Sequence, residues 1–138
     1  MSKTSRSNQL AALYNSQMEG IRRIRAGVDG QEIYNWTLKN FDRYGFPTDF
    51  TKRPMEGFIH GVGHGVGIDI HEPPWINSSK CILEEGHVVT VEPGLYYQSA
   101  RDHIPAGGIR IEDMVLVTKD GCRNLTQFPK NLESMIIP

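Results

Sequence analysis

Three histidines fall within twelve residues of this chain, and glycine occupies every second position from 61 to 67. The histidines are His60, His64 and His71, out of five in the whole sequence. Imidazole nitrogens bind metal ions and transfer protons, and glycine lets the backbone approach a ligand closely. The spacing does not match a phosphate-binding glycine loop, and no Lys-Ser/Thr pair follows it. We interpret the cluster as a candidate metal or proton-transfer site, although any one of these histidines alone reads more simply as a packed or exposed side chain.

Two glutamates interrupt apolar segments that otherwise read as strands. Glu92 follows the run VVTV, and Glu112 lies within GGIRIEDMVLV. Strand alternation puts Thr90 with Glu92 on one face, and Arg110 with Glu112 on one face as an expected ion pair. Taken alone, Glu92 fits a solvent-facing strand end and Glu112 fits an ordinary salt bridge. Together with one histidine, the two carboxylates form a nitrogen-and-oxygen donor set that suits Mn²⁺, Fe²⁺, Co²⁺ or Zn²⁺.

The elements that must position these residues are two helices followed by strands. Apolar residues recur at three- and four-residue steps from position 8 to 25, and a second helix begins at Asp29, with Glu32 completing a capping box. Gly27 and Gly45 are the expected helix ends. Strands are predicted near Phe58–His60, His87–Tyr97, Ile109–Thr118 and Arg123–Thr126, with a tight turn at 119–121. This order predicts an α+β fold, in which two helices pack on one face of an antiparallel sheet and leave the other face for a site.

Composition excludes several classes of protein. The 138 residues suit one domain, with 38% hydrophobic and 22% charged residues and a net charge of -1. Charges of both signs are mixed, so no nucleic-acid partner is predicted. No apolar run approaches the roughly 20 residues that span a bilayer, and the N-terminus lacks a secretory signal, so no membrane partner is expected. Cys81 and Cys122 lack the spacing of a redox motif or a disulfide framework, so we expect buried free thiols and a cytoplasmic location.

Three motifs in this chain resemble one known family. HGVGHGVGIDIHEPP, VTVEPGLYY and GGIRIEDMVLVTKDGCRNLT are similar to the C-terminal half of metallopeptidase family M24, which has the pita-bread fold. The resemblance is to Xaa-Pro aminopeptidases and Xaa-Pro dipeptidases (prolidases). It is strongest from Gly57 to Thr126 and implies that residues 1–138 form a partial M24 catalytic domain.

The resemblance implies metal ligands at His64, Glu92 and Glu112, with Glu112 bridging two ions. Mn²⁺ is the preferred cofactor, and Co²⁺, Zn²⁺ or Fe²⁺ are alternatives. The family's remaining ligands are two aspartates, spaced Asp-x10-Asp, in the preceding half of the fold. Asp102 and Asp113 have this spacing but lack the residues that surround the family's pair. We therefore expect this chain to hold at most one ion weakly, where the complete site holds two.

The resemblance also implies catalytic and substrate-binding residues. His60 and His71 would contact the substrate, and His71 would donate to the developing oxyanion. Arg110 would support the ligands in the catalytic site, and Tyr96 would lie beside the substrate. The implied reaction is metal-assisted hydrolysis of a peptide that has proline in its second position.

Two hypotheses follow because the aspartate half is not found in the sequence. In the first, the chain is part of a proline-directed metallopeptidase. In the second, it is a non-catalytic peptidase-like domain that serves binding or assembly. In either case, a homodimer or a missing N-terminal half is expected to cover the open face of the sheet.

Overall fold

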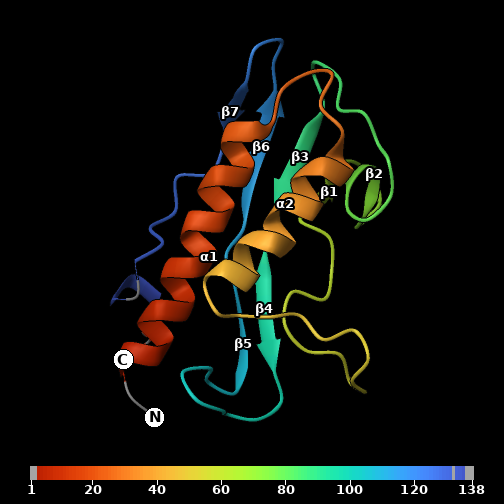
Figure 1. Cartoon of the computed structure of the whole chain (residues 1–138). Coiled ribbons are helices and arrows are strands. Elements are labelled where there is room, and N and C mark those ends of the chain that lie inside the picture. The colour runs from red at the N-terminus through yellow and green to blue at the C-terminus, as the bar shows by residue number, and fades with distance from the viewer. Residues whose placement is uncertain (1–2, 132, 136–138) are drawn as a thin grey trace.

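The computed structural model describes residues 3–131 and 133–135 (Figure 1). Both helices lie together on one face of the strands, which is the predicted α+β arrangement (Figure 1). The elements in chain order are α1 (Lys3–Arg23), α2 (Gly30–Arg43), β1 (Gly63–Gly65), β2 (Glu72–Ile76), β3 (Val88–Val91), β4 (Gly94–Tyr97), β5 (Gly107–Arg110), β6 (Asp113–Val117), β7 (Cys122–Asn124) and a 3-10 turn at Glu133–Met135.

Helix α2 begins where its cap predicted. The Asp29 carboxylate accepts hydrogen bonds from the backbone N–H of Gln31 and from that of Cys81, both at 3.0 Å. The first bond caps the helix, and the second ties the cap to the segment before β3. The helix ends at Arg43, and Gly45 follows with a φ of 79°, which glycine adopts without strain.

Helix α1 is displaced toward the N-terminus from its predicted range of 8–25. Gly27 has the expected left-handed φ of 86°, but the helix already ends at Arg23. The backbone N–H of Gly27 donates to the Leu83 carbonyl at 2.8 Å, and that of Ala26 donates to the Thr118 carbonyl at 3.0 Å. Hydrogen bonds to distant segments therefore replace the last predicted turn of the helix. The spacing of apolar residues along the helix does not reveal such long-range bonds.

The strands form a five-stranded antiparallel sheet in the order β2-β1-β3-β6-β7 and a separate two-stranded sheet, β4-β5. The two long strands predicted at 87–97 and 109–118 are each broken, at Glu92-Pro93 and at Ile111-Glu112. The proline removes a backbone donor from the first of these breaks. The predicted turn at 119–121 is confirmed, since the Thr118 N–H donates to the Gly121 carbonyl at 2.9 Å between β6 and β7.

One predicted strand is absent, and two strands, β1 and β2, were not predicted. The segment Phe58–His60 is irregular: the Phe58 N–H donates to the Thr48 hydroxyl at 3.0 Å, and only Gly57 forms a backbone bridge, with Tyr96. Strand β2 was missed because Pro73 and Pro74 argue against a strand. The structure places β2 at an edge of the sheet, where prolines are tolerated.

The core lies between the helices and the sheet. Helix α1 packs on β3 and β4, and α2 packs on β2. Fully buried apolar side chains from both layers are Leu13, Ile24, Ile33, Phe41, Phe58, Ile76, Val89, Val91, Leu95 and Val115. No helix in the described part of the chain has the length and hydrophobicity to cross a bilayer. Cys81 and Cys122 are free thiols, as predicted, but only partly buried.

Candidate active site

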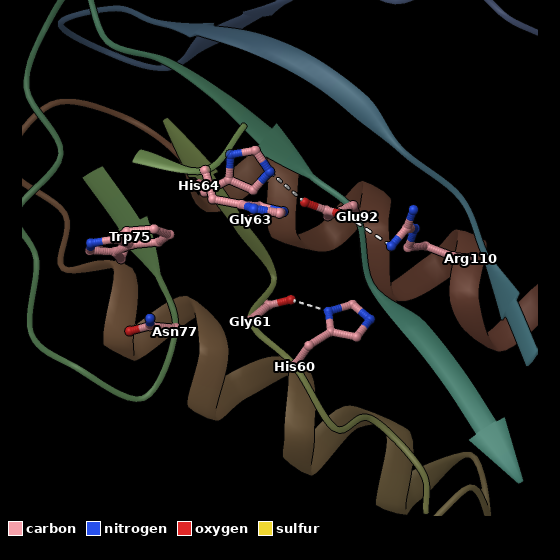
Figure 2. A pocket seen from close by; sticks show the side chains of 9 residues that line it. His60, Gly61, Gly63, His64, Trp75, Asn77, Glu92 and Arg110 are labelled. Carbon is pink, nitrogen blue, oxygen red and sulfur yellow. Dashed lines mark hydrogen bonds and ion pairs between the residues drawn. The ribbon is translucent and has the colours of Figure 1, made fainter. Parts of the chain in front are cut away.

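A pocket of about 310 Å³ opens on the sheet face that points away from the helices. Val89 and Val91 on β3 are buried in the core, so strand alternation turns Thr90 and Glu92 to the opposite face. The residues that line the pocket are His60, Gly61, Gly63, His64, His71, Trp75, Asn77, Glu92 and Arg110 (Figure 2).

His64 and Glu92 meet in this pocket, with Nε2 of His64 lying 3.0 Å from Oε1 of Glu92 (Figure 2). The Nδ1–H of His64 donates to the Gly65 carbonyl at 2.8 Å, so Nε2 of the neutral ring carries the lone pair. A lone pair that faces a carboxylate becomes favourable when a proton or a metal cation lies between the two. Two ligand atoms that are each about 2.1 Å from one cation stand roughly 3 Å apart at a right angle. The pair therefore fits a shared divalent ion.

Thr90 connects the backbone of His64 to the side chain of Glu92. The backbone N–H of His64 donates to the Thr90 hydroxyl at 3.0 Å, and that hydroxyl donates to Oε1 of Glu92 at 3.0 Å. In metal sites, hydrogen bonds to the ligand residues fix the orientation of those residues. Thr90 thus sets the position of the histidine backbone and of the carboxylate together.

Gly63 explains how β1 comes close enough to β3. A Cβ atom at this position would stand 1.8 Å from the carbonyl oxygen of Thr90, which is far inside contact distance. Only a residue without a side chain allows this approach, which brings His64 beside Glu92. Gly63 is therefore a packing requirement of the site.

Glu112 lies across the sheet from Glu92 but outside the pocket lining. The pairing register between β3 and β6 is the same as that between β4 and β5, and continuing it across the interruption sets Glu92 opposite Glu112. The Glu112 side chain is exposed. Within residues 3–131 and 133–135, no group of three His, Cys, Asp or Glu side chains could hold a metal ion. The structure thus brings His64 and Glu92 together, whereas Glu112 is not among the residues that line the pocket.

Arg110 pairs with a different glutamate from the one expected. Its Nη1 lies 3.5 Å from Oε2 of Glu92, and the predicted ion pair with Glu112 is not formed (Figure 2). The direct cross-strand partner of Arg110 is Gly94, which has no side chain. The long arginine side chain can therefore reach the diagonal neighbour, Glu92.

The other expected site residues surround this pair. The Nδ1–H of His60 donates to the Gly61 carbonyl at 2.7 Å, and the Tyr96 hydroxyl donates to Nε2 of His60 at 3.2 Å. The exposed His71 ring stands edge-on to the His64 ring, with 4.5 Å between ring centroids. Tyr96 thus reaches the pocket through its contact with His60, and His71 reaches it directly.

Two pocket residues were missed from the sequence. Trp75 lies on β2, and Asn77 directly follows that strand, on the side of the pocket away from Glu92 (Figure 2). The Trp75 backbone N–H donates to the Cys81 sulfur at 3.3 Å, which holds the end of the strand. A sequence signal was present in the aromatic residue after Pro73-Pro74, but it was not used because no strand was expected there.

Two helices cover one face of an antiparallel sheet, and a histidine–carboxylate pair lies on the other face. The chain belongs to metallopeptidase family M24, whose sequence profile matches residues 3–119. Its fold is the C-terminal half of the pita-bread fold, as the motifs predicted.

Individual relatives agree with this assignment. The chain is 36% identical to an uncharacterized peptidase of Bacillus subtilis, covering 91% of this chain and 33% of the relative. It is 34% identical to an Xaa-Pro dipeptidase of Pyrococcus furiosus, covering 85% of this chain and 30% of that relative. An X-Pro aminopeptidase structure from Thermotoga maritima superposes with a TM-score of 0.78 at 29% identity. The superposition covers 94% of this chain and 33% of the aminopeptidase. The chain therefore spans about a third of the length of these relatives.

Proposed function

We propose that this chain contributes the His64–Glu92 part of a metal-dependent peptidase site that hydrolyses Xaa-Pro peptide bonds. The observation that carries the proposal is the 3.0 Å contact between Nε2 of His64 and Oε1 of Glu92. Membership of family M24 supports peptidase chemistry, and relatives named as an Xaa-Pro dipeptidase and an X-Pro aminopeptidase support the substrate class.

His64 and Glu92 would hold a divalent cation, and Glu112 would be a further ligand from the facing strand. Mn²⁺ is our proposed ion, with Co²⁺, Zn²⁺ or Fe²⁺ as alternatives for this nitrogen-and-oxygen donor set. When bound, the cation supplies Lewis-acid polarisation of the scissile carbonyl and activation of water. We propose that this chain alone holds at most one such ion weakly.

The remaining residues act on the substrate. His71, at the pocket edge beside His64, can donate a proton or a hydrogen bond to negative charge that develops on the scissile carbonyl oxygen. His60 is fixed by Tyr96 and forms part of the substrate-binding wall. Arg110 offsets the charge of Glu92 from 3.5 Å. Because proline offers no amide N–H, this wall must recognise the shape of the ring.

The direct test is calorimetric titration of Mn²⁺ into the purified chain. We expect His64→Ala and Glu92→Gln to bind Mn²⁺ at least about tenfold more weakly than the unchanged chain. His103→Ala is the matched control, because that exposed histidine contacts the Gly45 carbonyl outside the pocket. Equal affinity in the His64 variant and the control would contradict the proposed site.

A second candidate function is non-catalytic peptide binding or assembly through the same pocket. It is favoured by the exposed position of Glu112 and by the lack of a three-ligand group among the described residues. Incubating the chain with an Xaa-Pro dipeptide and Mn²⁺ separates the two candidates. Hydrolysis that His64→Ala abolishes would reject the second candidate, and metal binding without hydrolysis would favour it.

We also propose that the open side of the molecule is covered, by a second copy or by an N-terminal half of the pita-bread fold. Ile68 and Ile70, in the loop between β1 and β2, have relative exposures of 103% and 85%. Apolar side chains this exposed are typical of an interaction surface. Light scattering of the purified chain tests the homodimer, and a strictly monomeric chain would reject it.

A cytoplasmic location is proposed from the two free thiols. Cys81 and Cys122 are unpaired, and burial raises the pKa of the Cys122 thiol, which keeps it protonated and unreactive. Fractionation with a tagged chain tests the location, and recovery in a secreted fraction would contradict it.

A further inference from the structure

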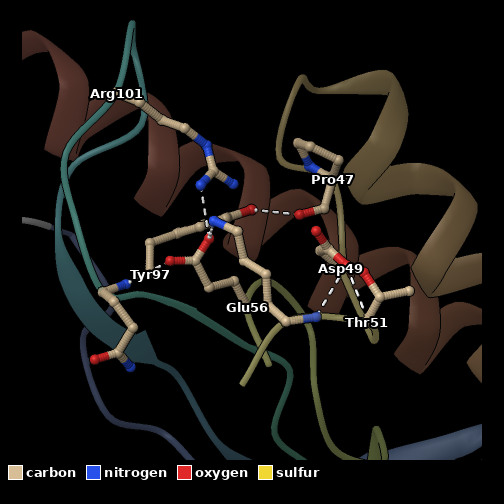
Figure 3. Close-up of polar contacts among 8 residues, drawn as sticks. Pro47, Asp49, Thr51, Glu56, Tyr97 and Arg101 are labelled. Atoms are coloured by element: carbon tan, nitrogen blue, oxygen red, sulfur yellow. Dashed lines mark hydrogen bonds and ion pairs between the residues drawn. The ribbon is translucent and has the colours of Figure 1, made fainter. Parts of the chain in front are cut away.

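Glu56 is a buried carboxylate outside the pocket, in the loop between α2 and β1. Its relative exposure is 2%. Oε2 accepts hydrogen bonds from Nζ of Lys52 and from Nη1 of Arg101, both at 2.6 Å, and Oε1 accepts one from the Gln98 N–H at 3.0 Å (Figure 3). A buried carboxylate is unfavourable unless it is satisfied in this way. Since Gln98 and Arg101 belong to the β4–β5 connection, Glu56 fastens its own loop to the end of β4.

The backbone beside Glu56 makes the same connection. The Gly57 N–H donates to the Tyr96 carbonyl at 2.8 Å, and the Tyr96 N–H donates to the Gly57 carbonyl at 3.0 Å. One residue further along, the Tyr97 hydroxyl donates to the Pro47 carbonyl at 3.0 Å (Figure 3). Tyr96 and the residue after it are thus both held by hydrogen bonds to this loop.

Tyr96 in turn reaches the pocket. Its hydroxyl donates to Nε2 of His60 at 3.2 Å, and the other ring nitrogen of His60 donates to the Gly61 carbonyl. There is little free space around this pair, because a Cβ at Gly94 would stand 2.6 Å from the Tyr96 hydroxyl oxygen and 2.9 Å from Nε2 of His60. A small shift of β4 would therefore change the contact between the two rings.

We propose that Glu56 is a positioning residue for the pocket. Its ion pair with Arg101 holds the end of β4 where the Tyr96 hydroxyl fixes the His60 ring in one tautomer and one orientation. The inference rests on the proposed function in taking His60 as part of the substrate-binding wall, but its geometry involves neither metal nor substrate. The competing interpretation is that Glu56 anchors a surface loop without any effect on the pocket.

The test is nuclear magnetic resonance of the metal-free, substrate-free chain with ¹⁵N-labelled histidine rings. Tyr96→Phe, which removes only the hydroxyl, defines the ring-nitrogen shift of His60 when the contact is lost. We expect Glu56→Gln and Arg101→Gln to shift the His60 signals in the same direction. In the Tyr96→Phe background, Glu56→Gln should change the His60 shift by less than it does in the unchanged chain. Both substitutions act on the same contact between Tyr96 and His60.

The matched control is Arg23→Gln, which removes an arginine from another carboxylate, Glu19, on the surface of α1. It should leave His60 unchanged, and the His103 signals should stay constant in every variant. If Glu56→Gln does not fold, Arg101→Gln decides the matter, since that side chain is 35% exposed. Folded variants with unchanged His60 signals would overturn the proposal. Because neither metal nor peptide is present, this outcome is distinct from a failure of the proposed function.

Discussion

The backbone of His64 and the side chain of Thr90 are joined by a hydrogen bond of 3.0 Å from the His64 N–H to the threonine hydroxyl. The same hydroxyl donates to Glu92, so one buried side chain orders both members of the candidate metal-binding pair. Thr90 itself has no role as a ligand. Its contribution is testable separately from that of the residues it orients.

Thr90→Val keeps the shape of the side chain and removes the hydroxyl. We expect the free energy of unfolding to fall by about 1–3 kcal/mol, because a buried N–H and a carboxylate oxygen lose their partner. Mn²⁺ binding should weaken by roughly tenfold or more, as for other residues that orient ligands. Urea denaturation and calorimetric titration measure the two effects. Thr90→Ser retains the hydroxyl and should restore both, and a valine variant with unchanged Mn²⁺ affinity would argue against the orienting role.

Glu112→Gln tests whether the two facing glutamates share a cation. Like charges that face each other across neighbouring strands are destabilising, so the metal-free variant should be slightly more stable than the unchanged chain. The same variant should bind Mn²⁺ more weakly. Glu85→Gln, in the exposed segment before β3, is the control for a simple change of charge. If both variants behave alike in thermal unfolding and in titration, Glu112 does not belong to the site.

Acid should weaken the Glu56 contacts in a defined range of pH. Hydrogen bonds from Lys52 and Arg101, followed by that from the Gln98 N–H, lower the pKa of Glu56 from 4.5 to about 2. Because the folded pKa lies below the unfolded one, the stabilisation is complete above pH 4.5 and is lost as the pH falls toward 2. The stability difference between the unchanged chain and Glu56→Gln, measured by urea unfolding, should therefore shrink below pH 4.5. A difference that stays constant from pH 7 to pH 3 would contradict the lowered pKa.

Asp29→Ala removes the cap of α2 together with its bond to Cys81. We expect the midpoint of thermal unfolding to fall by about 3–6 °C, since the N–H groups of Gln31 and Cys81 both lose their acceptor. Asp29→Asn keeps an acceptor oxygen, so its midpoint of thermal unfolding should fall by less than that of the alanine variant. Circular dichroism during heating provides the measurement, and an alanine variant that melts with the unchanged chain would show that the cap is dispensable.

Features governed by neighbouring residues were predictable from the sequence. The cap at Asp29 and the turn at 119–121 follow from local side-chain and backbone preferences, and both are present. The resemblance to family M24, rather than any local pattern, singled out His64 and Glu92, whose side chains lie 3.0 Å apart.

Features governed by distant pairing were not predictable. Arg110 contacts Glu92 because its direct partner on the facing strand is Gly94, and no local pattern states which residues face each other. Trp75 enters the pocket only because β2 pairs with β1 at the edge of the sheet. Side-chain alternation along one strand predicts which face of the sheet a residue occupies. The pairing register between two strands decides which residues become its neighbours.

The two prolines of β2 limit how this molecule can associate. An edge strand normally offers a row of free N–H groups onto which another chain can extend the sheet. Neither Pro73 nor Pro74 has an N–H group, so this stretch of the outermost strand offers fewer donors to another chain. Extension of the sheet by a second chain is thereby disfavoured at the β2 edge, whereas the edge formed by β7 has no such proline.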